Sequence, residues 1–214
     1  MLHSIFSGLN IIDWLYDTVC MIPAIIIGLS LHEYAHAKVA DLCGDPTPRM
    51  MGRVTIDPRA HVDIYGLIAL LVVHFGWGKP VMVNPTNFRH RKLDTFLVSI
   101  AGVTMNCIVA VIFGLILRFA IRSSIYSFFL TKAGGIIWSI LSSVVVINFG
   151  LMLFNLLPIP PLDGFNAIAT IFNLDTRNAL KNSMIILIIL ILLDVPSYLL
   201  GKPLSFLVNH LIFL

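Results

Sequence analysis

The stretch Leu31-His32-Glu33-Tyr34-Ala35-His36-Ala37 contains the pattern H-E-x-x-H and lies at the end of a long apolar run. Residues four apart share one face of a helix, so His32 and His36 can offer two imidazole nitrogens to one metal ion. Glu33 lies beside this pair, where a general base for a metal-bound water belongs. The alternative is a helix that places two histidines on one face by chance. That alternative is weaker in an apolar run, because ionisable side chains are costly inside a bilayer.

The composition indicates an integral membrane protein. Of the 214 residues, 58% are hydrophobic and 12% are charged, and the mean hydropathy is +0.94. Soluble domains carry about 25% charged residues. The formal charge of +3 is small and no basic run is interleaved with aromatic residues, so we expect no nucleic-acid partner. The cysteines show no C-x-x-C spacing and indicate neither a disulfide framework nor a cysteine zinc cluster. We interpret residues 1–214 as one integral membrane domain.

Three apolar segments are long enough to cross a bilayer as helices: residues 18–39, 95–117 and 136–157. The fold class predicted from them is an all-α polytopic membrane protein, a helical bundle with a three-span core. The apolar segment at 64–77 is too short for a confident span and favours a re-entrant or interfacial segment. Residues 183–214 fit a span and a surface helix equally well.

Two short segments have the pattern of β-strands. Val54 and Ile56 alternate with polar residues between Gly and Pro, and residues 79–85 repeat such a pattern. We predict that the two segments pair in a small sheet at the membrane edge.

The distribution of basic residues predicts the topology. Eight of the 14 Lys and Arg residues lie between Lys38 and Lys92, and none precedes Lys38. This arrangement indicates no cleavable signal peptide. The positive-inside rule places the N-terminus outside and residues 38–92 in the cytoplasm, with the lipid bilayer in contact with the spans. Two further spans return the chain to the cytoplasmic side where Asp163 occurs, so the histidine pair and Asp163 are expected at the same face.

A catalytic zinc usually has three protein ligands and one open position for water. Asp163 is our choice for the third ligand, because it follows the rigid Pro158-Ile159-Pro160-Pro161 turn at the end of a span. Irregular backbone at that depth needs a protein or water environment, which a metal site provides. Capping of the next helix is an equally good interpretation of Asp163 on spacing alone. The weaker candidates for this ligand are His61, His74, His90 and Cys43.

A metal held by these three residues would activate a water for attack on a peptide carbonyl, with Glu33 as the base. Asn106, in the middle of the second span, and Asn155, just before the prolines, can donate hydrogen bonds to a substrate backbone or an oxyanion. Interhelical hydrogen bonding is the alternative for both, and it is slightly favoured for Asn106. Asn148 is interpreted as a packing residue.

The motifs taken together resemble the site-2 protease family of intramembrane zinc metalloproteases, in its compact prokaryotic branch without a PDZ domain. They run in order from about Leu31 to Gly164, and include residues 32–37, 44–46, 52–58, 61–63, 76–81 and 155–164. The resemblance implies one Zn²⁺ per chain, held by His32, His36 and Asp163, with Glu33 as the catalytic base. It also implies a helical core of three spans and cleavage of a substrate's transmembrane segment near the cytoplasmic face, as in regulated intramembrane proteolysis. One departure is Val103, where the family often has a proline three residues before the span asparagine, here Asn106.

The leading interpretation is therefore a membrane-embedded zinc endopeptidase that acts on single-span membrane proteins. A catalytically inactive scaffold or helix-binding pseudoprotease is the first alternative, although every residue of the expected catalytic set is present. A metal transporter would need ionisable residues at matched depths in several spans. The second and third spans contain no Asp, Glu, Lys, Arg or His, which argues against a permeation path.

Overall fold

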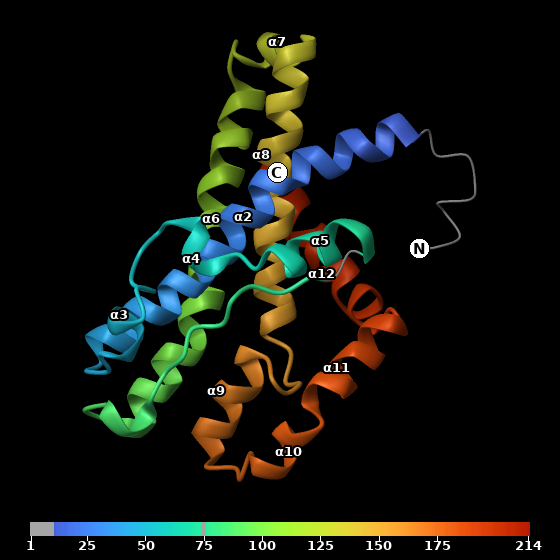
Figure 1. The fold of residues 1–214 in the computed structure, drawn as a ribbon. Coiled ribbons are helices and arrows are strands. Elements are labelled where there is room, and N and C mark those ends of the chain that lie inside the picture. The colour runs from blue at the N-terminus through green and yellow to red at the C-terminus, as the bar shows by residue number, and fades with distance from the viewer. Residues whose placement is uncertain (1–10, 74–75) are drawn as a thin grey trace.

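Three long helices form the centre of the protein (Figure 1). The computed structural model describes residues 11–73 and 76–214, and the central helices are α2 (Ile11–Leu42), α6 (Arg91–Arg122) and α8 (Lys132–Asn155). Each packs against the other two. All three are long and apolar enough to cross a membrane, so the predicted multi-pass, all-α class with a three-span core is confirmed. With 32 residues each, α2 and α6 run about 48 Å at 1.5 Å per residue. They therefore tilt within a hydrocarbon core of about 30 Å or extend beyond it.

Small residues let the three helices approach one another closely. Ala24, Val109 and Val144 are buried where α2, α6 and α8 meet. A second apolar cluster, which includes Leu117 and Phe149, joins α6 and α8 to the C-terminal helix. Lipid is as apolar as these side chains, so close packing and interhelical hydrogen bonds hold such a bundle together.

The end of α8 places Asp163. A proline cannot continue a helix, and Pro158, Pro160 and Pro161 follow α8 closely. The chain turns and re-enters a helix at once as α9 (Asp163–Phe172), which packs against α6 and ends at Asn173 in the left-handed conformation, with φ of 52°. This turn brings the first residue of α9 to the metal motif of α2.

Short elements connect α2 to α6 on one side of the bundle (Figure 1). They are α3 (Thr47–Met50), α4 (Pro58–His61), α5 (Ile64–Val73) and the single 3₁₀ turn η1 (Pro85–Asn87). With ten residues, α5 is too short to span a bilayer, as expected. Residues 78–84, which we call the strap, run without helix or strand between α5 and η1.

The prediction of a small sheet at the membrane edge is wrong, because the described residues form no strand there. One isolated antiparallel bridge, between Val62 and Gly78, stands in its place. The reason lies in the strap, where backbone N–H groups that would pair with a second strand donate to side-chain carboxylates instead. Val81 N donates to Glu33 Oε2 at 3.0 Å, and Asn84 N donates to Asp45 Oδ2 at 2.7 Å.

The last segment of the chain forms three helices, α10 (Arg177–Lys181), α11 (Ser183–Leu192) and α12 (Val195–Ile212). The last two meet at an angle of 70° and have the length and composition of either a broken span or a re-entrant loop. α12 packs back on α6 and α8, where Ile212 is buried.

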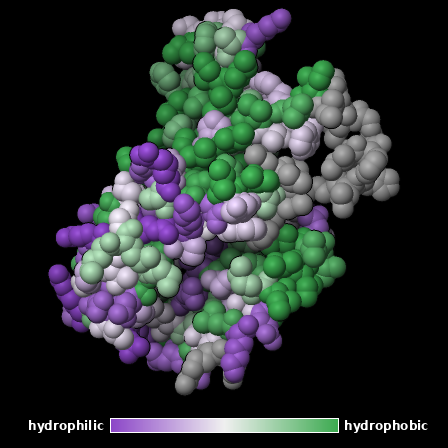
Figure 2. Space-filling view, in the orientation of Figure 1, coloured by the Kyte–Doolittle hydropathy of each residue, from purple (hydrophilic) through white to green (hydrophobic). Residues whose placement is uncertain are grey.

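The surface separates into apolar and polar regions (Figure 2). Hydrophobic side chains gather over α6 and α8 near α7 (Tyr126–Phe129) and over α11, and hydrophilic side chains gather over α3 and the start of α6. Along α6, Ile112, Leu115 and Phe119 are exposed. Exposed apolar side chains on helices of this length are the lipid-facing surface of a multi-pass membrane protein.

Candidate metal centre and active site

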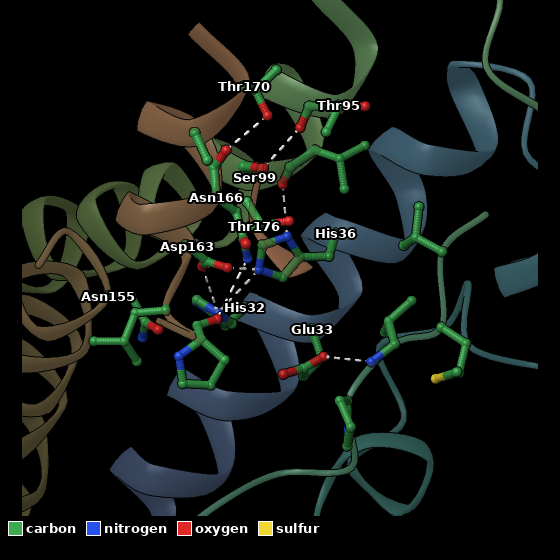
Figure 3. Close-up of a pocket in the computed structure, with 18 of the residues that line it drawn as sticks. His32, Glu33, His36, Thr95, Ser99, Asn155, Asp163, Asn166, Thr170 and Thr176 are labelled. Carbon is green, nitrogen blue, oxygen red and sulfur yellow. Dashed lines mark hydrogen bonds and ion pairs between the residues drawn. The ribbon is translucent and has the colours of Figure 1, made fainter. Parts of the chain in front are cut away.

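The two histidines of α2 and the carboxylate that begins α9 converge on one point (Figure 3). His32 Nε2 and His36 Nε2 are 3.1 Å apart, and Asp163 Oδ2 lies 3.2 Å from each. Both histidines are buried. Among the described residues, no other group of three or more His, Cys, Asp and Glu side chains brings its donor atoms together in this way.

The spacing of the three donor atoms fits a tetrahedral zinc ion. Zn–N and Zn–O bonds of about 2.0–2.1 Å at tetrahedral angles separate neighbouring ligand atoms by about 3.3 Å. The observed separations of 3.1 and 3.2 Å are close to that value. Two imidazoles and one carboxylate also form a common catalytic zinc set, with a fourth position left for water or substrate.

Asp163 faces the histidines and does not cap its helix. Leu162 occupies the N-cap position of α9 and makes no side-chain capping bond. A carboxylate is ionised at neutral pH, as a metal ligand must be, and Asp163 Oδ2 lies at the same distance from both imidazoles.

Each imidazole also makes a hydrogen bond through Nδ1, the nitrogen that faces away from the other two donors. His36 Nδ1 donates to the carbonyl oxygen of Val98 at 2.7 Å, and His32 Nδ1 lies 2.7 Å from Asn106 Oδ1. Metal-binding histidines typically use their second nitrogen for such a bond, which orients the ring. The bond to Val98 leaves Nε2 of His36 with its lone pair toward the point where the three donor atoms converge, which we call the metal point.

Gly102 lets α6 approach the two rings. A Cβ atom at this position would lie 2.5 Å from His32 Cε1 and 2.6 Å from His32 Nδ1, and it would also collide with His36 Nε2. Only glycine fits there without a shift of the helix or the rings. Sequence reasoning did not single out Gly102, because its role depends on how closely α6 approaches the histidines of α2.

Glu33 points away from the three donors and toward the strap (Figure 3). Its Oε2 accepts a hydrogen bond from Val81 N at 3.0 Å, and its side chain is half-buried. The same cavity is lined by Glu33 and by all three candidate ligands. Glu33 is thus beside the metal point without belonging to the group of converging donors.

The cavity has a volume of about 1220 Å³ and lies between α2, the strap, α6, α8, α9 and α11. Asn155 is on its wall, and Asn155 Nδ2 donates to Leu151 O at 3.0 Å. Asn106 is fully buried and is not among the lining residues. Polar residues that sequence reasoning did not single out also line the cavity: Thr95, Ser99, Asn166 and Thr170.

The other candidates for the third ligand lie elsewhere. His61 is buried in α4, with Nε2 donating to Thr55 O at 2.7 Å, and His90 is exposed just before α6. Cys43 follows α2, where burial and the neighbouring Asp94 raise the pKa of its thiol. His74 lies outside the described residues.

Comparison with known proteins assigns the family. The model of peptidase family M50 matches residues 20–193. The chain belongs to this family. The site-2 protease resemblance seen in the sequence is thereby confirmed, and His32, His36 and Asp163, the three candidate ligands, fall inside the matched range.

Individual relatives agree with this assignment. The chain is 36% identical over 202 residues to "Putative zinc metalloprotease YwhC" of Bacillus subtilis, with 90% of each chain covered. It is 27% identical over 186 residues to "Putative zinc metalloprotease Rip2" of Mycolicibacterium smegmatis, covering 84% of this chain and 68% of that one. The Rip2 protein of Mycobacterium tuberculosis H37Rv is 31% identical over 168 residues, which is 76% of this chain and 61% of that one. No solved structure gives a significant match.

Proposed function

We propose that this protein is a zinc-dependent intramembrane endopeptidase that hydrolyses peptide bonds in or near the transmembrane segments of other membrane proteins. The observation that carries the proposal is the convergence of His32, His36 and Asp163 inside a bundle of membrane-spanning helices, with Glu33 on the same cavity. Membership of a peptidase family and the zinc metalloprotease names of its relatives support both the metal and the reaction. One Zn²⁺ per chain matches the single converging group among the described residues.

The residues divide the chemistry between them. His32, His36 and Asp163 would hold the zinc ion, which supplies Lewis acidity that activates a water and polarises the substrate carbonyl. Glu33 accepts the proton of the attacking water and delivers it to the leaving amine. Its Oε2 is occupied by Val81 N–H, whereas Oε1 has no hydrogen-bond partner among the described residues. We therefore assign the proton transfer to Oε1.

The cavity accommodates an unwound peptide segment. A substrate helix must open to expose its scissile carbonyl, and each freed peptide group then needs a hydrogen-bond partner. Asn155 uses one amide hydrogen on Leu151 O, which leaves the second hydrogen for a substrate carbonyl or oxyanion. We propose single-span membrane proteins as the substrates, because the cavity adjoins the membrane-spanning helices.

The proposed orientation follows from charge. The connection between α2 and α6 carries most of the basic residues, which favours the cytoplasmic side for this end of the bundle. The metal point lies in the half of α2 nearest that connection. Cleavage near the cytoplasmic face, with the N-terminus outside, is the arrangement that we propose.

Reconstitution with a substrate tests the function against the inactive-scaffold alternative. The wild-type protein and a Glu33→Gln variant are placed in lipid vesicles with single-span test proteins, and cleavage and zinc content are measured. We expect Glu33→Gln to abolish cleavage and retain zinc, because Glu33 is not one of the converging donors.

Asp17→Asn is the matched control, because it makes the same kind of acid-to-amide change at an exposed position on the same helix. It should cut like the wild type. Cleavage by Glu33→Gln at the wild-type rate would refute the assignment of the base. A wild-type protein that binds zinc and the test proteins without cutting any of them would favour the scaffold.

A further inference from the structure

A continuous line of buried polar groups crosses the apolar centre of the bundle behind the metal point. It starts at His32 on α2, passes through Asn106 on α6 and ends at Asn148 on α8. Both asparagines are fully buried, with 0% of each exposed. Buried polar groups in a membrane bundle require partners, and here each side chain is the partner of the next.

We propose that Asn106 and Asn148 form an amide relay that fixes the proton of His32 on Nδ1 and so presents the lone pair of Nε2 to the metal. This inference rests on the proposed zinc site, and it assigns Asn106 and Asn148 as positioning residues. Asn106 bonds His32 at Nδ1, whereas the converging donor atom of this ring is Nε2, and Asn148 bonds Asn106.

The direction of the relay is set by two backbone carbonyls. A carbonyl oxygen can only accept a hydrogen bond. Val144 O lies 2.8 Å from Asn148 Nδ2, so the amide of Asn148 must turn its Nδ2 toward Val144 and its Oδ1 toward Asn106. Gly28 O lies 3.1 Å from Asn106 Nδ2 and fixes the amide of Asn106 independently.

The amide of Asn106 passes this direction to the histidine. Its two N–H groups are both used, one on Gly28 O and one on Asn148 Oδ1 at 2.9 Å. Its Oδ1 therefore faces His32 Nδ1 at 2.7 Å and can only accept. His32 must be the donor at Nδ1, which leaves Nε2 unprotonated and free to bind a metal ion.

The two histidines thus reach the same tautomer by different routes. His36 donates directly to Val98 O on α6. His32 instead faces a side chain, whose two possible orientations would favour opposite tautomers. The bonds of Asn106 to Gly28 O and Asn148 Oδ1, and of Asn148 to Val144 O, leave each amide one orientation. These residues lie on all three central helices.

The relay also accounts for the role of Asn106. With both amide hydrogens engaged and no exposed surface, Asn106 has no donor left for a substrate. We therefore propose that Asn106 orients His32 and does not contact the substrate. The proposed substrate contact is kept for Asn155 alone.

The first test needs no variant. The zinc-bound wild-type protein is labelled with ¹⁵N-histidine, and nitrogen NMR spectra identify the protonated and the ligated nitrogen of His32. We expect the proton on Nδ1 and zinc on Nε2. The opposite assignment, with zinc on Nδ1, would overturn the relay.

The second test measures zinc affinity by competition with a chelator in Asn106→Leu, Asn148→Leu and the double variant. Loss of a residue that orients a metal ligand typically weakens metal binding by about 10–100-fold. We expect Asn106→Leu to fall in that range and Asn148→Leu to weaken binding less. The double variant should be no weaker than Asn106→Leu alone, because the two residues act in series.

Two controls separate positioning from packing. Asn106→Asp keeps an acceptor for His32 Nδ1, so it should bind zinc more tightly than Asn106→Leu. Ser30→Ala removes a buried hydroxyl of α2 that has no hydrogen-bond partner among the described residues, and it should bind zinc like the wild type.

Equal affinities for Asn106→Asp and Asn106→Leu, or a wild-type affinity for both leucine variants, would overturn the relay. A wild-type protein that cleaves its substrate while the leucine variants keep full zinc affinity would overturn the relay alone. Failure of the wild-type protein to bind zinc would overturn the proposed function and the relay together.

Discussion

The close approach of α6 to the two histidines makes Gly102→Ala the most informative single substitution in this protein. The added Cβ would lie 2.5 Å from His32 Cε1 and 2.6 Å from His32 Nδ1, and closer still to His36 Nε2. Ordinary van der Waals contact begins at 3.4 Å, so the ring and the helix must separate by about 0.9 Å. Metal–ligand distances in genuine sites fall within about 0.2 Å of their ideal values. If the rings take up even half of the required separation, the change exceeds that range.

The expected result is loss of zinc and of stability together. Overpacking of this kind costs about 1–3 kcal/mol, and we expect zinc affinity to fall at least tenfold. Zinc content after purification, chelator competition and thermal unfolding in detergent measure the two effects. Gly150→Ala on α8 is the matched control, because a Cβ there meets nothing within 4 Å, and it should bind zinc normally with unchanged or slightly higher stability. A Gly102→Ala protein with wild-type zinc affinity and thermal stability would refute the reasoning.

Three further results are expected. Asp163→Ala removes one of the three converging donors and should reduce zinc content, whereas unchanged content in a zinc assay would exclude Asp163 as a ligand. Chelation of zinc should lower the unfolding temperature and added Zn²⁺ should restore it, because a ligand at 100 times its Kd stabilises by about 2.7 kcal/mol. Burial raises the pKa of Asp45, but hydrogen bonds from Thr47, Asn84 and Asn87 outweigh burial and lower it. Asp45 therefore contributes stability above its unfolded pKa of about 3.9, which is lost as the pH falls through its lower folded pKa. Unfolding of Asp45→Asn followed at several pH values should lack this component, and an unchanged acid profile would contradict it.

The sequence predicted the elements of this protein that depend on local patterns. A spacing of four residues places His32 and His36 on one helical face in any α-helix, so the structure of α2 was bound to bring them together. Hydropathy located the three spans. The helices α2 and α6 extend beyond the predicted segments at both ends, whereas α8 begins earlier than predicted and ends at Asn155, ahead of the prolines. The prolines after Leu157 indicated the break that precedes Asp163.

Features that depend on contacts between distant segments could not be predicted in this way. Strand propensity in residues 79–85 indicated a sheet, but it could not show that Glu33 and Asp45 would take the N–H groups of Val81 and Asn84. Asn148 was interpreted as a packing residue, because its link to the metal site runs through Asn106 on another helix. The importance of Gly102 likewise depends on how closely two helices approach, which no single segment encodes.

The candidate site combines donors that the helical bundle holds with a candidate base that the strap holds. The candidate metal ligands are held by packed spans, by the His32–Asn106–Asn148 hydrogen bonds and by a carbonyl of α6. Glu33 instead bonds the strap, whose contacts with the rest of the protein include the Val62–Gly78 bridge and the Asp45–Asn84 bond near its two ends. On the proposed function, a peptide in the cavity would lie beside this strap, because Val81, Met82 and Val83 line the same cavity as the candidate metal ligands. The residue proposed as the base is therefore bonded to the same segment that a bound peptide would contact.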